Sequence, residues 1–148
     1  MELIFRKIDE NDPLDLSAFC QLMDQLSQRA DSLELLKRNI AAVNKRDNSY
    51  LMAAQDAESG RLCGSLLGIV CEDFCGPCTP FMLIENVVTH RDYRRQGVGR
   101  RMFEEIERWG RERDVRYAIL CSSNSRSDAH EFYPSIGYEN IKGYKKYL

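Results

Sequence analysis

The chain has 148 residues, of which 43% are hydrophobic and 30% are charged. One domain of this length can bury most of its apolar surface, so we expect a single domain over residues 1–148. The 21 basic and 23 acidic residues give a formal net charge of -2. This balance excludes an overall basic field that would hold nucleic acid or an anionic membrane.

The sequence also bears on the compartment. Its apolar stretches fall far short of the roughly 20 residues that a transmembrane helix needs. The first six residues lack the long apolar core of a secretory signal. A chain with its own core does not need its six cysteines as disulfides. We therefore expect a cytoplasmic protein with reduced cysteines and without a membrane or nucleic acid as partner.

The first third predicts one strand followed by two amphipathic helices. Residues 3–8 are rich in β-forming side chains, and Asp12 with Pro13 ends this strand and caps the next element. Apolar residues then recur at helical spacing in two stretches, the second capped by Asp31 or Ser32. They are Phe19, Leu22, Met23 and Leu26 in the first stretch and Leu33, Leu36, Ile40 and Val43 in the second.

The middle of the chain predicts three strands. Residues 51–57 and 62–73 read as a hairpin that turns at Ser59 and Gly60, because both runs are rich in apolar residues around a turn signal. Residues 81–89 are rich in β-branched and apolar side chains and predict a further strand.

The last third predicts a long helix and three shorter elements. The helix begins near Val98, because apolar side chains recur on one face among arginines and glutamates. A strand over 115–121, a short helix over 128–136 and a hairpin-like segment over 137–148 follow. The whole order predicts a mixed α/β fold in which helices cover a central sheet.

A short basic turn joins the strand ending near His90 to the long helix. Gly97 and Gly99 lack a Cβ, so the backbone can adopt positive φ and bring its N–H groups close to an anion. The helix adds unpaired N–H groups and the positive end of its dipole. A dinucleotide fingerprint would need a third glycine at Met102, and no Gly-Lys-Ser/Thr follows. The turn predicts a phosphate site, with a solvated basic turn as the alternative.

Two segments resemble the GNAT superfamily of N-acetyltransferases. Residues 94–99 match its signature, Gln/Arg-x-x-Gly-x-Gly/Ala between a strand and a helix. Residues 129–138 are similar to its short helix carrying Phe-Tyr, here Phe132 and Tyr133, followed by Gly137 and Tyr138. The resemblance implies the GNAT fold: a central, mostly antiparallel twisted sheet of six to seven strands with about four helices. It also implies acetyl-CoA as cosubstrate, an amine acceptor, direct transfer in a ternary complex and no metal.

The resemblance further implies roles for individual residues. Tyr133 corresponds to the tyrosine that protonates the departing thiolate. Val87 and Val88 correspond to a strand bulge whose backbone holds the thioester carbonyl and the pantetheine amides. The loop residues implied to contact the coenzyme are Arg94, Arg95, Gln96, Gly97, Val98, Gly99 and Arg100. Asn124 is implied to contact the pantetheine arm, but it lies farther from Ala129 than the common family pattern has it. Ser123, Ser125 and Arg126 are therefore alternatives for this contact, and an adenosine phosphate is the alternative ligand of Arg126.

The residues themselves leave other points open. Glu85 stands in an otherwise apolar strand, where a carboxylate is a candidate base, and an edge glutamate facing solvent is the alternative. Cys75 and Cys78 are spaced like a thioredoxin redox pair, but Pro80 follows and the segment reads as a turn. A non-catalytic module that binds acyl-CoA is the rival function. The identity of the acceptor, a small molecule or a protein amine, and a homodimeric assembly also stay open.

Overall fold

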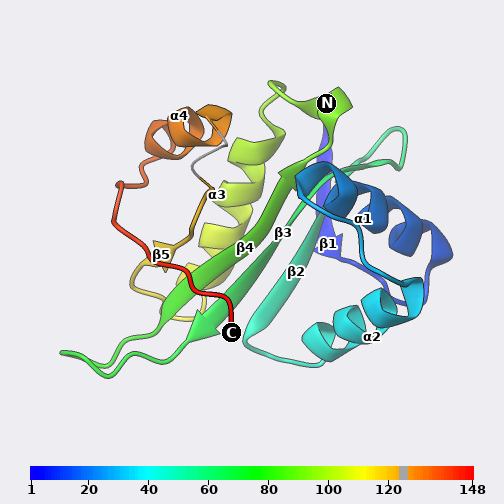
Figure 1. Cartoon of the computed structure of the whole chain (residues 1–148). Coiled ribbons are helices and arrows are strands. Elements are labelled where there is room, and N and C mark those ends of the chain that lie inside the picture. The colour runs from blue at the N-terminus through cyan, green and yellow to red at the C-terminus, as the bar shows by residue number, and fades with distance from the viewer. Residues whose placement is uncertain (124–126) are drawn as a thin grey trace.

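The computed structural model describes residues 1–123 and 127–148 of the chain. Within them, a five-stranded sheet has the order β1-β2-β3-β4-β5 and is antiparallel except for the parallel pair β4–β5 (Figure 1). The elements in chain order are β1 (Leu3–Lys7), α1 (Pro13–Leu26), α2 (Leu33–Asn44), β2 (Ser49–Asp56), β3 (Leu62–Cys71), β4 (Phe81–Thr89), a 3-10 turn (Arg91–Tyr93), α3 (Val98–Arg111), β5 (Ala118–Ile119) and α4 (Ser127–Ser135). The predicted mixed α/β architecture is confirmed.

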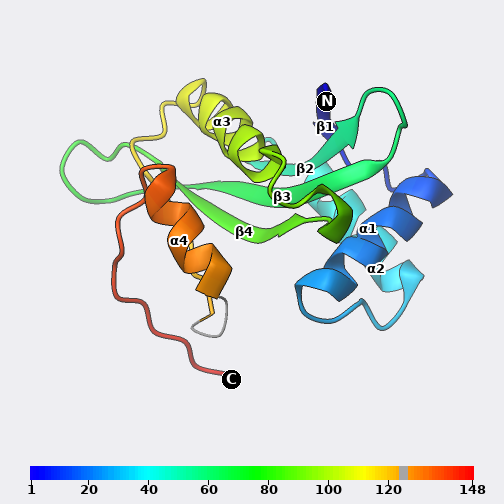
Figure 2. The ribbon, with the colours of Figure 1, turned by 90° about the horizontal axis from the view of Figure 1, so that it is seen from above.

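The helices lie on both faces of the sheet. Figure 2 shows α3 on one side and α1 with α2 on the other. Side chains alternate along β2, so Met52 packs in the cluster with Met102 and Ile106 of α3, while Leu51 packs with residues of α1 and α2. The sheet therefore separates two hydrophobic cores.

Local sequence signals explain where several elements begin. The Asp12 carboxylate accepts the backbone N–H of Leu14 at 2.9 Å, and Pro13 occupies the first turn of α1. The Ser32 hydroxyl accepts the backbone N–H of Leu35 at 3.1 Å and caps α2. Gly60 has φ +71° in the turn between β2 and β3. The predicted caps and the predicted hairpin are confirmed.

A buried ion pair ties α1 to the edge strand. Asp15, 4% exposed, receives hydrogen bonds from Arg6 at 2.5 and 2.7 Å and from the backbone N–H of Asp9 at 2.8 Å. Burial alone would raise the pKa of Asp15, but the bonds from Arg6 and Asp9 hold it below its ordinary value. Breaking this pair would leave a buried charge unpaired, so it anchors the start of α1.

The C-terminal part differs from the sequence prediction. The strand expected over 115–121 is only Ala118–Ile119, and the hairpin-like segment expected over 137–148 forms no strand. The sheet of the described residues thus has five strands rather than six to seven. Ile141, Tyr144 and Tyr147 are 63%, 87% and 85% exposed. Strand register is specified where one face is buried, and residues 139–148 are all exposed.

Candidate functional site

The strands β4 and β5 pair only at one end. Met82 stands opposite Ala118 and Leu83 opposite Ile119, and these are the paired positions of β4 and β5. β4 continues to Thr89 while β5 ends at Ile119, so residues 84–89 extend past β5 with β3 as their strand partner (Figure 1). Backbone groups on this edge of β4 are therefore available to a ligand.

Residues 84–89, the part of β4 that lacks β5 as a neighbour, contain a bulge. Val88 stands opposite Ser65 and Glu85 opposite Leu67, so β4 has one more residue than β3 between the two pairs. Asn86 has φ +52° at this point. A bulge leaves ladder groups unpaired and bends the strand. The bulge expected near Val87 and Val88 is present where β4 has lost β5 as a neighbour.

We call residues 94–99 the basic loop. Arg95 and Gly97 have φ +60° and +81°, and Gly97 is the N-cap of α3 without a capping side chain. The first turn of α3 contains no acidic residue; it holds Arg100 and Arg101 instead. Cations at a helix N-terminus oppose the macrodipole by about 0.3–1 kcal/mol each. The uncapped N–H groups and the exposed arginines together fit an anionic ligand.

Side chains from the loop and from α1 fix the segment before the basic loop. Gln25 of α1 accepts the backbone N–H of Arg91 at 2.8 Å, and Nδ1 of His90 accepts that of Asp92 at 3.2 Å. The Gln96 amide donates to the carbonyl of Asp92 at 2.7 Å, so this side chain holds the loop in shape. Burial lowers the pKa of His90, although the nearby Asp92 carboxylate acts in the opposite direction. The lowered pKa keeps Nδ1 free to accept this hydrogen bond.

The helix α4 packs against the start of α3. A Cβ on Gly99 would lie 3.2 Å from Cζ of Phe132, so a glycine allows this approach. Tyr133 is half-buried, and its ring centroid lies 5.8 Å from that of Phe103 and 5.4 Å from that of Phe132. The structure therefore brings Tyr133 to the helix that follows the basic loop.

Tyr138 completes this aromatic cluster. Its ring lies 5.3 Å from Phe103 and 6.3 Å from Tyr133, and its hydroxyl donates to Glu107 at 3.3 Å. Burial, followed by the charge of Glu107, raises the pKa of Tyr138. Tyr138 therefore stays protonated and packs beside Tyr133 on a fixed support.

The other predicted site residues fall in three places. The side chains of Arg94, Arg95 and Arg100 are exposed around the start of α3. The side chain of Glu85 is also exposed rather than enclosed by apolar groups, and the bulge follows it in β4. The predictions for Asn124 and Arg126 lie outside the described residues.

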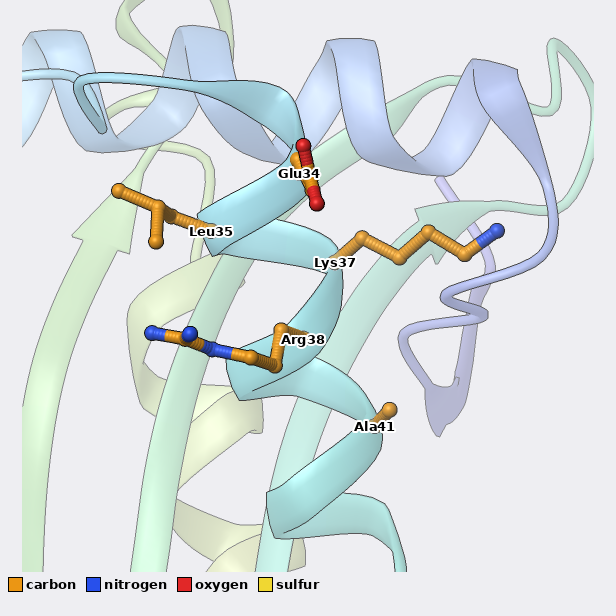
Figure 3. Close-up of a pocket in the computed structure, with 5 residues that line it drawn as sticks. All are labelled: Glu34, Leu35, Lys37, Arg38 and Ala41. Atoms are coloured by element: carbon orange, nitrogen blue, oxygen red, sulfur yellow. The ribbon is translucent and has the colours of Figure 1, made fainter.

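A separate hollow lies on the outer side of α2, lined by Glu34, Leu35, Lys37, Arg38 and Ala41. Figure 3 shows these five side chains leaving the helix in different directions. All of them belong to α2, and a hollow on one helix presents no converging set of polar groups. It therefore does not compete with the open edge of β4.

The Cys75 and Cys78 pair lies on the loop 72–80, which we call the hairpin tip. Both thiols are exposed and free, and the N–H of Cys78 donates to the carbonyl of Cys75 at 3.1 Å in a turn. β4 follows the turn, so these thiols lack the helix N-terminus that activates a redox cysteine. In residues 1–123 and 127–148, no cluster of three or more His, Cys, Asp or Glu is placed to hold a metal, and no helix could cross a bilayer.

Sequence reasoning missed the residues that act through distant contacts. Gln25 reads only as a polar position on α1, although it holds Arg91 across 66 residues of chain. Phe132 and Gly99 belong to separate motifs in the sequence, and the fold brings them into contact. A polar residue in the last turn of a helix is the one available signal for Gln25, and it is a weak one.

Solved structures with the same fold span essentially the whole chain. Glucosamine-6-phosphate N-acetyltransferase from Arabidopsis thaliana has 18% identity and a TM-score of 0.81, with 100% of this chain and 99% of that chain covered. A GNAT family acetyltransferase from Staphylococcus aureus has 23% identity and a TM-score of 0.81, with 100% of both chains covered. An aminoglycoside acetyltransferase from an uncultured soil metagenomic sample, in complex with sisomicin, has 17% identity and a TM-score of 0.77, with 99% and 96% covered.

No curated protein shows significant sequence similarity to the chain. The profile of the acetyltransferase (GNAT) family matches residues 16–138, which contain β4, the basic loop, α3 and Tyr133. The chain belongs to the acetyltransferase (GNAT) family.

Proposed function

We propose that the chain transfers an acetyl group from acetyl-CoA directly to a primary amine while both are bound, without a covalent enzyme intermediate. The observation that carries the proposal is that the open edge of β4, its bulge and the uncapped start of α3 lie on one continuous stretch, residues 84–100. Acetyl-CoA supplies the acyl thioester. The family implies this cosubstrate, and the site fits an anion followed by an amide-bearing arm.

The basic loop binds the pyrophosphate in this proposal. The backbone N–H groups of Gly97, Val98 and Gly99 approach the anion, because no side chain caps them. Arg94, Arg95 and Arg100 add positive charge from exposed positions, and Gln96 holds the loop. Asn124 and Arg126 remain proposed contacts to the pantetheine arm and an adenosine phosphate.

The bulge orients the reacting acyl group in this proposal. The backbone of Val87 and Val88 lies at the edge that β5 leaves open. N–H groups fixed in such a place can donate to a developing oxyanion without reorganising. The ligand thereby accepts hydrogen bonds from backbone groups that the bulge leaves without a partner in the sheet.

Proton transfer uses two side chains. Glu85, exposed beside the bulge, accepts the proton of the ammonium directly or through water, which frees the lone pair of the amine. Tyr133 donates its hydroxyl proton to the departing thiolate, and its packing against Phe103 and Phe132 holds the ring in place. The bond formed is N–C and the bond broken is C–S. The second proton that the nitrogen loses restores the hydroxyl of Tyr133, and the proton on Glu85 leaves to water.

Release of free CoA thiol from acetyl-CoA, followed with a thiol reagent across a panel of amines, tests the proposal. An amine-dependent rate well above the rate without amine is expected. Tight binding of acetyl-CoA without amine-dependent release across the panel would contradict transferase activity and favour an acyl-CoA-binding module. We also propose that residues 1–148 form one domain, for which limited proteolysis should leave one resistant fragment.

A further inference from the structure

Three aliphatic side chains form a row across the sheet outside both cores. Ile69 of β3 stands opposite Leu83 of β4, and Leu83 stands opposite Ile119 of β5. We call Ile69, Leu83 and Ile119 the aliphatic row. Each is half-buried, and none belongs to the two buried clusters of the described chain or to the side chains packed on them. Apolar groups aligned in this way offer a surface for an apolar ligand.

The row faces the side of the sheet that carries α1 and α2. Met82 and Ile84 pack in the core under α3, as do Ala118 and Leu120. Side chains alternate along a strand, so Leu83 and Ile119 point to the opposite face. On that face α1 packs on β3 and β4, where it covers Val88, and α2 packs on β2; Figure 2 shows both helices there.

The large apolar side chains of the C-terminal segment do not pack on the row. A Cβ on Gly143 would lie 3.4 Å from the sulfur of Cys121, so the segment passes close to the end of β5. Its own apolar side chains nevertheless point into solvent, with Ile141 63% and Tyr144 87% exposed. Packing on the row would have buried at least one of them.

A carboxylate and an aromatic pair flank the row on its two sides, along the direction of β4. Glu85 is two residues from Leu83 along β4 and therefore on the same face, roughly 7 Å away at about 3.3 Å per residue. Phe81, two residues in the other direction, stacks on Tyr117 with ring centroids 5.4 Å apart and an interplanar angle of 8°. Tyr117 is 45% exposed. The face thus presents a negative charge beside the bulge, then aliphatic groups, then aromatic rings.

We propose that the acceptor is a primary amine carried on an apolar body, with its ammonium beside Glu85 and its body over the aliphatic row. This inference rests on the proposed function, since the bulge beside Glu85 is where the acyl group is received. A carboxylate complements an ammonium, and the row gains from being removed from water. A polyhydroxylated amine would place hydroxyl groups against Ile69, Leu83 and Ile119, which offer no side-chain hydrogen bonds.

Calorimetry on the full chain with CoA present tests the inference, with phenethylamine, methylamine and glucosamine as probes. Phenethylamine should bind at least about tenfold more tightly than either of the others, the scale expected of an apolar pocket. Leu83→Ser should raise the Kd of phenethylamine at least about fivefold and leave that of methylamine unchanged. Leu35→Ser, at a 40% exposed leucine of α2, is the matched control and should change neither Kd.

Equal affinity for glucosamine and phenethylamine would overturn the inference, as would an equal loss for all amines in Leu83→Ser. Ile69→Ser replaces Leu83→Ser if the latter fails to bind acetyl-CoA normally. If Leu83→Ser lost self-association while its amine binding stayed unchanged, the row would be an interface between two copies of the chain, and the inference would be overturned. Phenethylamine bound at the row without thiol release would contradict the transferase proposal alone, whereas equally efficient release with glucosamine would contradict the inference alone.

Discussion

The basic loop and the hairpin tip are both glycine turns, yet their surroundings differ. Gly97 has φ +81° and Gly76 has φ +55°, and a Cβ on either would meet nothing within 4 Å. The basic loop leads into α3, and Gln25 and His90 hold the segment before it. The hairpin tip, green at the lower left of Figure 1, projects from the sheet, with Phe74 89% exposed.

The contrast shows that a glycine turn acquires its chemistry from the element into which it leads. Unpaired N–H groups and a helix dipole come after Gly97, whereas a proline and a strand come after Gly76. In the proposed function, the same backbone freedom supports an anion site in one turn, whereas in the other it allows only a change of direction. Substitutions in and around the two turns can test this difference.

The largest expected effect is on kcat, and it compares Tyr133, which packs near the basic loop, with the two thiols of the hairpin tip. Tyr133→Phe should lower kcat about tenfold or more, because general-acid catalysis contributes at least about that factor. The measurement is amine-dependent thiol release at saturating acetyl-CoA. The control, Cys75→Ser with Cys78→Ser, should retain the wild-type kcat. An unchanged kcat in Tyr133→Phe would remove this tyrosine from the mechanism.

A matched pair of glycine replacements tests the loops directly. Gly97→Val should weaken acetyl-CoA binding about tenfold or more, because valine at positive φ costs on the order of 1–3 kcal/mol and moves the N–H groups. Gly76→Val carries comparable strain but should leave the Kd of acetyl-CoA unchanged. Calorimetry measures both. Equal loss of binding in the two variants would show a general folding defect rather than a local anion site.

A smaller effect is expected from the contact between α3 and α4. Gly99→Ala should lower the free energy of unfolding by about 1–3 kcal/mol, because its methyl group would crowd the ring of Phe132. Phe132→Leu in the same chain should recover part of that loss. Denaturant unfolding of the single and double variants gives the coupling. Strict additivity would contradict the contact.

The smallest expected effect concerns pH. The pKa of His90 is lowered in the folded chain, so the unfolded chain binds more protons as the pH falls below the ordinary value near 6.5. The stability that His90 contributes should be complete above about pH 6.5 and decrease as the pH falls from there through the lowered folded pKa. His90→Asn, which keeps an acceptor for Asp92, should flatten this part of the unfolding profile. Identical profiles for wild type and His90→Asn would contradict the assignment.

Local signals were enough for most of the fold and for part of the site. Asp12, Ser32 and Gly60 predicted boundaries that the structure confirms, because caps and turns depend on a few neighbouring residues. Residues 81–89 were predicted as a strand with the same bounds as β4. The C-terminal hairpin was wrong, since strand formation in 137–148 depends on a partner surface that the pattern does not encode.

The amino-acid sequence by itself determined the glycine turn at 94–99, the amphipathic helix after it and the aromatic residues of α4. Only the tertiary structure decided that β4 extends past the end of β5 and that Glu85 is exposed. It also decided that Ile69, Leu83 and Ile119 align outside both cores. The reason is physical. Helix periodicity and turn chemistry act over a few residues, whereas strand pairing and burial depend on segments that meet only when the chain has folded.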